Sequence, residues 1–498
     1  MKEIDIYNHY KPFRNYLKKF HLHGSLHIIW RYHQEFYQNK FRPIEPTCLM
    51  EPGIIRQNYG PFYIWELEII TKELILHSEQ NGIRSLEKLN EFINVINFIR
   101  RIDGEIAKQQ GSNNAFRNLQ AKIHQQFPWQ IPSSIQSIMR YYLIYGGSKV
   151  SSIVENKIGL TLKQVYTLGM AISGHFLNNW GMSINQDYSK LGVDNERGAL
   201  FFKHITSTFD SLKKTIRQTQ KYNATWGYTF NPLQNTPLIT FNHDYPNRVI
   251  CPLPSYLIKR ITEGIFYDVV GEPGFDNAYG EAYEEYVGKV LNRAFSSSNF
   301  TIIPESQYRV CKDTKHGVDW ILKDSTGAIC IECKTKRLLR DAKFDTNSGF
   351  LDNELENMAK FIVQNYKNVE DIRTKKTNWQ YDGCPIYPVV ITLEDWLLLN
   401  PVILKELEKK VCLLLDKEGI DKKIIKEMPY SVISITDAEF RFQIINQIGI
   451  SPYAQKNIDK GLFPLAMNHD EHHKDVRFKS LFETEFNEFV ELITTSQI

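Results

Sequence analysis

The chain has 498 residues, 60 basic against 57 acidic side chains, a formal net charge of +3 and a hydrophobic share of 42%. This length exceeds what one hydrophobic core usually organises, so we expect two or three domains. The balanced charge argues against a protein that coats nucleic acid non-specifically, so any nucleic-acid affinity must be local.

The first residues and the cysteines indicate a cytoplasmic protein. The beginning, MKEIDIYNHYKPF, lacks the apolar core of a signal peptide, and no apolar run reaches the roughly 20 residues that span a bilayer. Seven cysteines without regular spacing suit free thiols in a reducing compartment. The one close pair, Cys330 and Cys333, is expected on a β-strand, where this spacing points the side chains to opposite faces and excludes a shared zinc ion.

The first half of the chain is predicted to be mostly helical. Phe62 to His77 and Leu86 to Lys108 have apolar positions at helical spacing. Prolines interrupt the pattern near residue 130. We therefore expect a helical domain at residues 1–130 and a helical subdomain at 131–245, which recognises a ligand or regulates the rest of the chain.

Within the subdomain, Lys149 to Ile158, then Gly159, then Thr161 to Phe176 predict a helix, a short turn and a second helix capped by Thr161. A DNA-binding helix-turn-helix and an ordinary helical hairpin both fit this pattern. The hairpin is favoured, because the second helix lacks the density of Arg, Asn and Gln expected of a base reader.

From Asn231 to Pro252 the sequence changes to prolines and short β-like runs, which predicts a domain transition. We expect a connecting segment at residues 246–274 and a second domain at 275–498. Its predicted elements are a helix from Ala278 to Phe295, a strand from Thr301 to Val310, a hairpin from His316 to Lys336, a helix from about Asn353 to Asn368, a strand from Ile386 to Leu393, a helix from Val402 to Asp416 and a strand from Tyr430 to Ile435. This order is a mixed α/β layout.

The stretch GVDWILKDSTGAICIECKTK, residues 317–336, predicts the hairpin in detail. Its turn is Asp324-Ser325-Thr326-Gly327. The apolar pairs of this register are Val318 with Cys333, Trp320 with Ile331, and Leu322 with Ile329. They form one face that packs against a helix, while Asp319 lies opposite Glu332 on the other face and Lys334 projects from the same side.

Two carboxylates that face each other across a strand pair repel unless a positive charge lies between them. A hard divalent cation with oxygen ligands supplies that charge, and Mg²⁺ is the first candidate, with Mn²⁺ as the alternative. The neighbouring Lys334 orients or deprotonates a water, or offsets negative charge on a phosphate. The set suits phosphodiester hydrolysis, although a solvated hairpin with a cross-strand salt bridge would show the same residues.

Asp319 and Glu332-Cys333-Lys334 resemble the motif of the PD-(D/E)XK nuclease superfamily, whose fold is restriction-endonuclease-like. Val318 stands where the motif's name has proline, a frequent variation. The resemblance covers roughly residues 275 to 440 and implies an α/β/α domain with a mixed central sheet. The fold class is thus α/β, with a mostly helical N-terminal half.

In this superfamily an acidic residue on the preceding helix often joins the site, and GEAYEEYVGKVL, residues 280–291, resembles that helix. Its apolar stripe is Tyr283, Val287, Val290 and Leu291. Glu284 lies at the border of the stripe and is turned toward the sheet, so we choose it over Glu281 and Glu285.

The resemblance implies a Mg²⁺-dependent endonuclease that hydrolyses DNA. Asp319 and Glu332 would bind the metal, Glu284 would support the metal or its water, and Lys334 would assist attack on the phosphorus. The main-chain carbonyl of Cys333 would add a ligand. By analogy, a nuclease joined to a helical domain is similar to restriction and anti-phage defence effectors, in which the helical half binds a partner protein or a second copy.

The residues expected to contact nucleic acid are Gln307, Lys336, Arg337, Arg340 and Lys343. For each, a surface polar residue is the alternative interpretation. The basic cluster of Arg373, Lys375 and Lys376 is interpreted as a solvated face, and His469 to His473 as a solvated loop or helix start. Two rival functions stay open: an RNA-cleaving nuclease, and a catalytically inactive nucleic-acid-binding module of the same fold.

Overall fold

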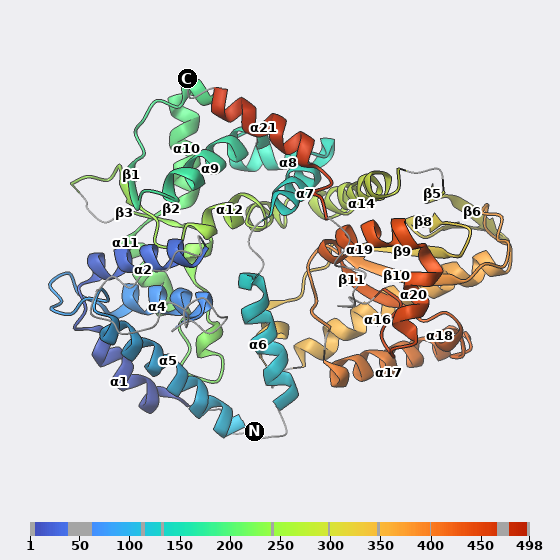
Figure 1. Cartoon of the computed structure of the whole chain (residues 1–498), viewed down its shortest axis with the longest axis horizontal. Helices are drawn as coiled ribbons and strands as arrows, with labels where there is room; N and C mark the ends of the chain where they lie inside the picture. Colours follow the sequence, from blue (N-terminus) through green and yellow to red (C-terminus); the bar gives the residue numbers. More distant parts are fainter. Residues whose placement is uncertain are drawn as a thin grey trace. The chain divides into compact units, whose positions relative to one another are not determined.

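The structure, a computed structural model, describes residues 5–37, 62–110, 115–130, 134–240, 244–296, 299–345, 349–398, 400–465 and 478–495. The chain divides into two compact units, which Figure 1 shows coloured along the sequence. The first unit comprises Met1–Ser134, Ser151–Val270 and Asn487–Ile498, and the second unit comprises Ile135–Val150 and Gly271–Phe486. In the described part of the chain, no helix is both long and apolar enough to cross a membrane.

The first unit is mainly helical. Its helices are α1 (Tyr7–Leu17), α2 (Leu22–Tyr37), α4 (Ile64–His77), α5 (Leu89–Gln110), α6 (Ala115–Gln130), α8 (Ser148–Ile158), α9 (Leu162–Phe176), α10 (Asn195–Ile205), α11 (Phe209–Thr219), α12 (Ser255–Ile261) and α13 (Ile265–Val269), with α21 (Glu483–Thr495) at the end of the chain. Helix α4, IWELEIITKELILH, is apolar on most sides, so it is buried at nearly every position between Ile64 and Leu76.

A small sheet completes the first unit. Its strands, in spatial order, are β1 (Gly181–Ser183), β4 (Arg248–Ile250), β3 (Leu238–Thr240) and β2 (Thr206–Thr208). The two short β-like runs predicted from the sequence are thus present as β3 and β4. The segment predicted to connect two domains belongs to the first unit as far as Val270, because β4, α12 and α13 pack there.

Helices α8 and α9 form the predicted helix, short turn and second helix, an arrangement that both the hairpin and the DNA-binding interpretation share. Gly159 makes the turn with φ +77°, and Thr161 Oγ1 accepts a hydrogen bond from Gln164 N at 3.2 Å. Helix α9 packs against α12 so closely that a Cβ on Gly169 would lie 2.6 Å from a methyl carbon of Ile261. The buried side of α9 is therefore packed against α12.

The second unit is built on a five-stranded sheet with the order β11–β10–β9–β8–β5. Strands β9, β10 and β11 are parallel, while β8 is antiparallel to both β9 and β5. The strands are β5 (Thr301–Pro304), β8 (Trp320–Lys323), β9 (Ala328–Lys334), β10 (Ile386–Thr392) and β11 (Ser431–Ser434). The helices are α7 (Ile135–Tyr145), α14 (Phe275–Ala294), α15 (Arg340–Phe344), α16 (Phe350–Arg373), α17 (Pro401–Lys417), α18 (Ile424–Glu427), α19 (Ile435–Ile448) and α20 (Ile450–Ile458).

The predicted register of the β8–β9 hairpin is confirmed. Trp320 pairs with Ile331 and Leu322 with Ile329, and Asp324 forms the turn by accepting hydrogen bonds from Thr326 N and Gly327 N. Trp320 packs on α14, where its ring lies against Gly288.

Two details of the predicted hairpin are wrong. Val318 precedes the first residue of β8. It packs with Ile321 under α16, on the side of the sheet opposite to Trp320. The second face of the hairpin is not a polar surface, because Ile321 and Cys330 on it are buried under α16. Helices cover both faces of the sheet, so polar side chains are confined to its end.

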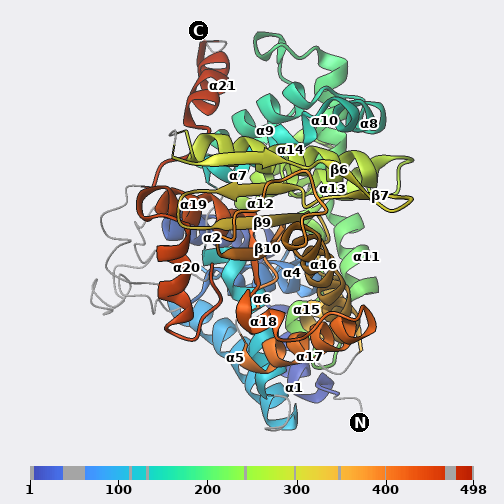
Figure 2. The same cartoon turned by 90° about the vertical axis from the view of Figure 1, so that its right-hand side faces the viewer.

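The single strand predicted from Thr301 to Val310 is two strands. Strand β5 ends at Pro304, and β6 (Gln307–Val310) pairs with β7 (Asp313–His316) in a separate two-stranded sheet, which can be followed in Figure 2. Gln307 therefore begins a hairpin outside the five-stranded sheet. The change of direction follows Pro304, which has no N–H for a ladder hydrogen bond.

Helix α7 was assigned to the N-terminal half from the sequence, but it packs in the second unit. It lies on α14, and Arg140 makes two hydrogen bonds to the buried carboxylate of Glu439, at 2.9 and 2.6 Å. Tyr286 also donates to Glu439, at 2.7 Å. A buried arginine needs a carboxylate partner, and that partner lies almost 300 residues along the chain, where sequence spacing gives no signal of it.

Candidate functional site

Four ionisable side chains lie at one end of the five-stranded sheet. Asp319 immediately precedes β8, while Glu332 and Lys334 lie at the end of β9. Because β8 and β9 are antiparallel, the start of one strand is beside the end of the other. Glu284 comes from α14, where it is half-buried and its neighbours Glu281 and Glu285 are exposed.

Each side chain on the two strands has a defined partner. Asp319 Oδ2 accepts a hydrogen bond from the main-chain N–H of Cys333 at 2.6 Å, which ties the two strands together beyond their last paired residues. Lys334 Nζ donates to Glu332 Oε1 at 2.5 Å and lies 5.3 Å from the centre of the Phe361 ring on α16. Phe361 therefore packs beside the ammonium group.

The site holds more negative charge than its one lysine neutralises. Burial, together with the charge of Asp319, raises the pKa of Glu332 to about 7. Burial and the same aspartate raise the pKa of Glu284 to about 7. Burial also raises the pKa of Asp319. A cation is the component that would relieve these three carboxyl groups.

Lys334 is held in its charged form. Burial by itself would lower the pKa of this amine, but the charges of Glu332 and Asp319 raise it above its ordinary value. The position of Lys334 beside Glu332 fits the roles expected from the sequence, which are to orient or deprotonate a water or to offset charge on a phosphate.

The residue types fit a hard divalent cation, and one oxygen supports that fit. Glu332 Oε2 is buried and has no hydrogen-bond partner among the described residues, so one strong acceptor faces the site unpaired. The ligand geometry is not formed in the described part of the chain, where no three His, Cys, Asp or Glu side chains are close enough to hold a metal together. Asp319 and Glu332 instead bind the Cys333 N–H and Lys334.

Cys333 can enter the site only through its main chain. Burial raises the pKa of its thiol well above the ordinary value, and the side chain is buried. The expected metal ligand, its carbonyl oxygen, is at the sheet end where Asp319 and Lys334 lie.

Glu305 also belongs to this end of the sheet, and sequence analysis missed it. Its main-chain N–H donates to the carbonyl of Asp319 at 2.8 Å, and its carboxylate lies 2.9 Å from His316 Nδ1. Its charge contributes to the raised pKa of Asp319 and of Glu284. An acid directly after Pro304 was the available signal, but the prediction of one long strand hid it.

The residues expected to contact nucleic acid have varied surroundings. Lys336 pairs with Glu354 at 3.3 Å, and Lys343 with Glu394 at 2.9 Å. Arg340 begins the short helix α15, and its guanidinium lies over the Phe344 ring. Gln307 begins β6, where its carbonyl accepts from Asn378 at 3.0 Å.

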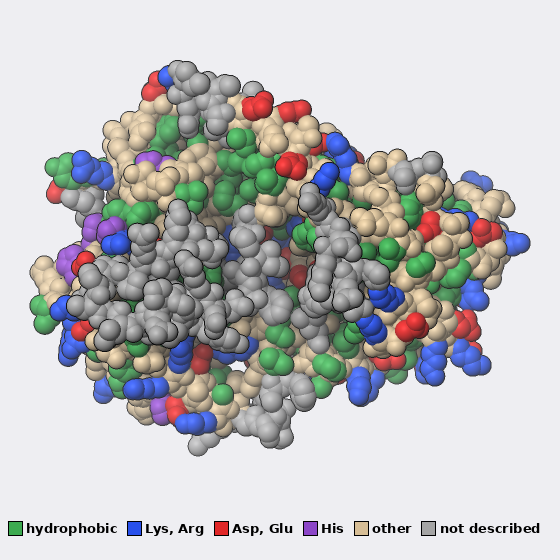
Figure 3. All heavy atoms as spheres, viewed as in Figure 1, with side chains coloured by type: hydrophobic (Ala, Val, Ile, Leu, Met, Phe, Trp, Pro, Cys, Tyr) green, Lys and Arg blue, Asp and Glu red, His purple; other side chains and the backbone are tan. Residues whose placement is uncertain are grey.

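Arg337 fits a structural role better than the expected contact with nucleic acid. Its side chain is only 9% exposed, and it lies 3.7 Å from Glu394 and donates to Tyr279 Oη at 3.4 Å. An arginine enclosed in this way is not presented to a phosphate. On the face drawn in Figure 3, basic side chains of the second unit are interspersed with acidic ones.

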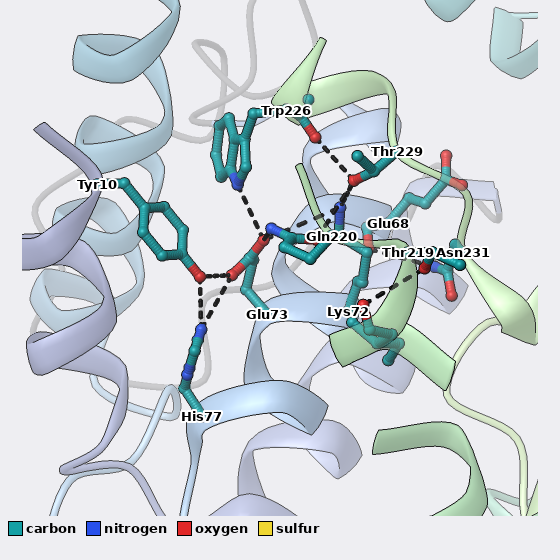
Figure 4. Close-up of polar contacts among 12 residues, drawn as sticks. Tyr10, Glu68, Lys72, Glu73, His77, Thr219, Gln220, Trp226, Thr229 and Asn231 are labelled. Carbon is teal, nitrogen blue, oxygen red and sulfur yellow. Dashed lines mark hydrogen bonds and ion pairs between the residues drawn. The ribbon is translucent and has the colours of Figure 1, made fainter. Parts of the chain in front are cut away.

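The first unit contains a buried polar cluster that sequence analysis did not single out (Figure 4). Glu73, in the middle of α4, accepts hydrogen bonds from Tyr10 at 2.6 Å, Gln220 at 2.8 Å and Trp226 at 3.1 Å. His77 Nε2 lies 3.6 Å from the same carboxylate. The signal in the sequence was Lys72-Glu73 inside an apolar helix. Because both Glu73 oxygens have donors, the cluster fits a structural role.

The histidine cluster from His469 to His473 lies outside the described residues. Comparisons of the chain with protein-family models, with curated proteins and with solved structures found no match.

Proposed function

We propose that the protein is a Mg²⁺-dependent nuclease that hydrolyses DNA phosphodiester bonds, with Glu284, Asp319, Glu332 and Lys334 as its active site. The observation that supports this most is the unpaired oxygen of buried Glu332 beside two further carboxyl groups. A buried polar atom without a partner costs about 1–3 kcal/mol, more if charged. A bound cation would remove that cost, so the arrangement favours a ligand-binding role.

The four side chains divide the work of hydrolysis among them. Bound Mg²⁺, or Mn²⁺ in its place, would polarise the phosphate and lower the pKa of a water. Asp319 and Glu332 would hold the ion, and Glu284 would accept hydrogen bonds from its water. Lys334 would keep its proton and offset the charge that develops on the phosphate oxygens.

The order of elements supports the same proposal. Helix α14 with Glu284 is followed by β5, β8 and β9, then by α16 on the other face and by β10 parallel to β9. This agrees with the α/β/α core that the PD-(D/E)XK resemblance implies. A chain that joins a helical unit to such a core is in keeping with a restriction or anti-phage defence effector.

Cleavage of supercoiled plasmid by the full chain tests the proposal. Wild type in Mg²⁺ should nick or linearise the plasmid, and EDTA or Asp319→Asn should abolish the reaction. Asp416→Asn is the matched control, because Asp416 is an exposed residue of α17 that pairs with Lys422. Cleavage that persists in EDTA or in Asp319→Asn would refute the metal site, and a structured RNA offered in parallel separates the RNA-cleaving alternative.

A further inference from the structure

A cavity of about 500 Å³ opens next to the carboxylate cluster, on the α16 side of the sheet. Its walls come from the last residues of β5, the beginning of β8 and the beginning of β6. The last turns of α16 and residues 377–380 complete them. Glu305 and Val318 both line it. Glu305 donates its N–H to Asp319, and Val318 directly precedes Asp319, so the cavity and the proposed catalytic aspartate share a wall.

The lining combines flat apolar surface with a few polar groups. Tyr308 and Trp379 contribute aromatic rings, and Ile321 and Ile372 are among the aliphatic walls. Thr377 Oγ1 is buried and has no hydrogen-bond partner within the described chain. A nucleobase has the complementary character, with two apolar faces and a polar edge, and the volume lies in the range of small-molecule sites, about 300–1,000 Å³.

The cavity is held open by hydrogen bonds that tie residues 377–380 to the β6–β7 hairpin. Asp371 accepts from Tyr308 Oη at 2.9 Å, from Lys315 at 2.8 Å and from Lys376 at 3.0 Å. Asn378 donates to the Gln307 carbonyl at 3.0 Å. A preformed cavity loses little entropy when it binds a ligand.

The basic cluster that the sequence analysis interpreted as a solvated face directly precedes cavity residues 377–380 in the chain. Helix α16 ends in a Schellman turn, in which Lys375 N bonds to Ile372 O and Lys376 N to Asp371 O. Lys375 occupies the left-handed position with φ +57°, where glycine is preferred. The turn places Lys375 two residues before Thr377, which lines the cavity.

We infer that this cavity binds an unpaired nucleobase of the strand whose phosphate lies at the carboxylate cluster. The inference rests on the proposed function and makes it narrower: the substrate is single-stranded or locally unpaired nucleic acid. Trp379 stacks on the base, Thr377 contacts its polar edge, and Lys375 attracts the backbone.

Binding by the full chain in EDTA tests the inference without cleavage. The probes are a single-stranded oligonucleotide with one fluorescent adenine analogue, the same oligonucleotide with an abasic position, and the matched duplex. Wild type should bind the single strand at least about tenfold more tightly than the duplex or the abasic strand, and it should quench the analogue. Equal affinity for all three probes overturns the inference.

Trp379→Ala should weaken single-strand binding by about tenfold and abolish the quenching. Phe440→Ala, which removes a 39% exposed ring from α19 of the same unit, is the matched control and should change neither. Thr377→Val keeps the shape of the side chain, so it covers the case in which Trp379→Ala fails to fold, and it should reduce discrimination between bases. Wild-type behaviour of both cavity variants overturns the inference.

The two proposals fail in different ways. Magnesium-dependent plasmid cleavage without any preference for unpaired bases would leave the nuclease and remove the base-binding cavity. A preference for single strands that depends on Trp379, without cleavage of any nucleic acid, would leave the cavity and remove the catalytic function.

Discussion

Each unit contains a fully buried glutamate, Glu73 on α4 and Glu332 on β9, and the two differ in how their oxygens are paired. Glu73 in the first unit is 0% exposed and receives hydrogen bonds from three side chains on other elements. Glu332 in the second unit is 1% exposed, with one oxygen bound to Lys334 and the other unpaired among the residues that the structure describes. A buried carboxylate whose two oxygens both accept hydrogen bonds stabilises the fold. A buried carboxylate with an unpaired oxygen lowers the free energy of unfolding, so stability does not explain its presence.

The comparison separates a structural buried charge from one available to a ligand. Burial and residue type are the same in both cases, so neither property identifies a functional site. An unpaired oxygen distinguishes Glu332 from Glu73, but it does not mark a functional site by itself, because Glu354 Oε2 is also buried without a partner among the described residues. The two further carboxyl groups beside Glu332 complete the distinction.

The largest expected effect concerns Glu332. Glu332→Gln should reduce plasmid cleavage on the order of 10³-fold, because an amide cannot supply the negative charge that holds the cation. The free energy of unfolding should stay within about 1 kcal/mol or rise, since the amide oxygen still accepts from Lys334, Asp319 remains as a charged neighbour of that lysine, and the carboxylate charge at position 332 is no longer buried. Single-turnover cleavage and denaturant unfolding measure both quantities. A large loss of stability would show that Glu332 is structural, like Glu73.

The converse is expected for Glu73. Glu73→Ala should lower the free energy of unfolding by about 3–5 kcal/mol, because it leaves the indole N–H of Trp226 buried without this acceptor and removes the buried carboxylate beside Lys72. The exposed Glu87→Ala is the control and should change stability by no more than about 0.5 kcal/mol. Denaturant titration measures the difference, and an unchanged midpoint for Glu73→Ala would contradict the structural interpretation.

A smaller change in the free energy of unfolding is expected when pH is lowered, because of His33, another buried titratable group of the first unit. Burial, and then the charge of Lys259, lowers the pKa of His33 to about 3, against about 6.5 in the unfolded chain. Between these values the unfolded chain binds a proton that the folded chain does not, so stability falls as pH falls below 6.5. From pH 7.5 to 5.5 wild type should lose about 1.4 kcal/mol more than His33→Gln. Parallel denaturant titrations at the two pH values check this, and equal losses would contradict it.

The smallest expected effect is at the edge of the base-binding cavity. Lys375→Gly should raise the free energy of unfolding by up to about 1 kcal/mol, because glycine adopts the left-handed conformation without strain. The same change should weaken binding of a single-stranded oligonucleotide, most strongly at low salt, because one cation is lost. Lys375→Asn is the control, because asparagine keeps the turn and removes only the charge. Lys410→Gly would not serve, because Lys410 lies inside helix α17 and not in a turn. If Lys375→Asn binds as wild type does, the lysine has no electrostatic role.

Local patterns in the sequence determined much of the second unit. The β8–β9 register followed from a turn sequence and from alternation along two short runs, both of which act within twenty residues. The helical spacing of Tyr283 and Val287 likewise set which side of α14 faces the sheet, and with it the half-buried position of Glu284. These features depend on neighbours along the chain, so the sequence contains them directly.

Only the tertiary structure decided the rest. Glu305 reaches Asp319 because the chain turns after Pro304, and α7 joins the second unit because Arg140 finds Glu439. Likewise, whether a buried glutamate oxygen is paired depends on donors from segments far along the chain, as Gln220 and Trp226 show for Glu73. Hydrogen bonds and ion pairs act over a few ångströms in space, and the separation of residues in sequence does not determine that distance.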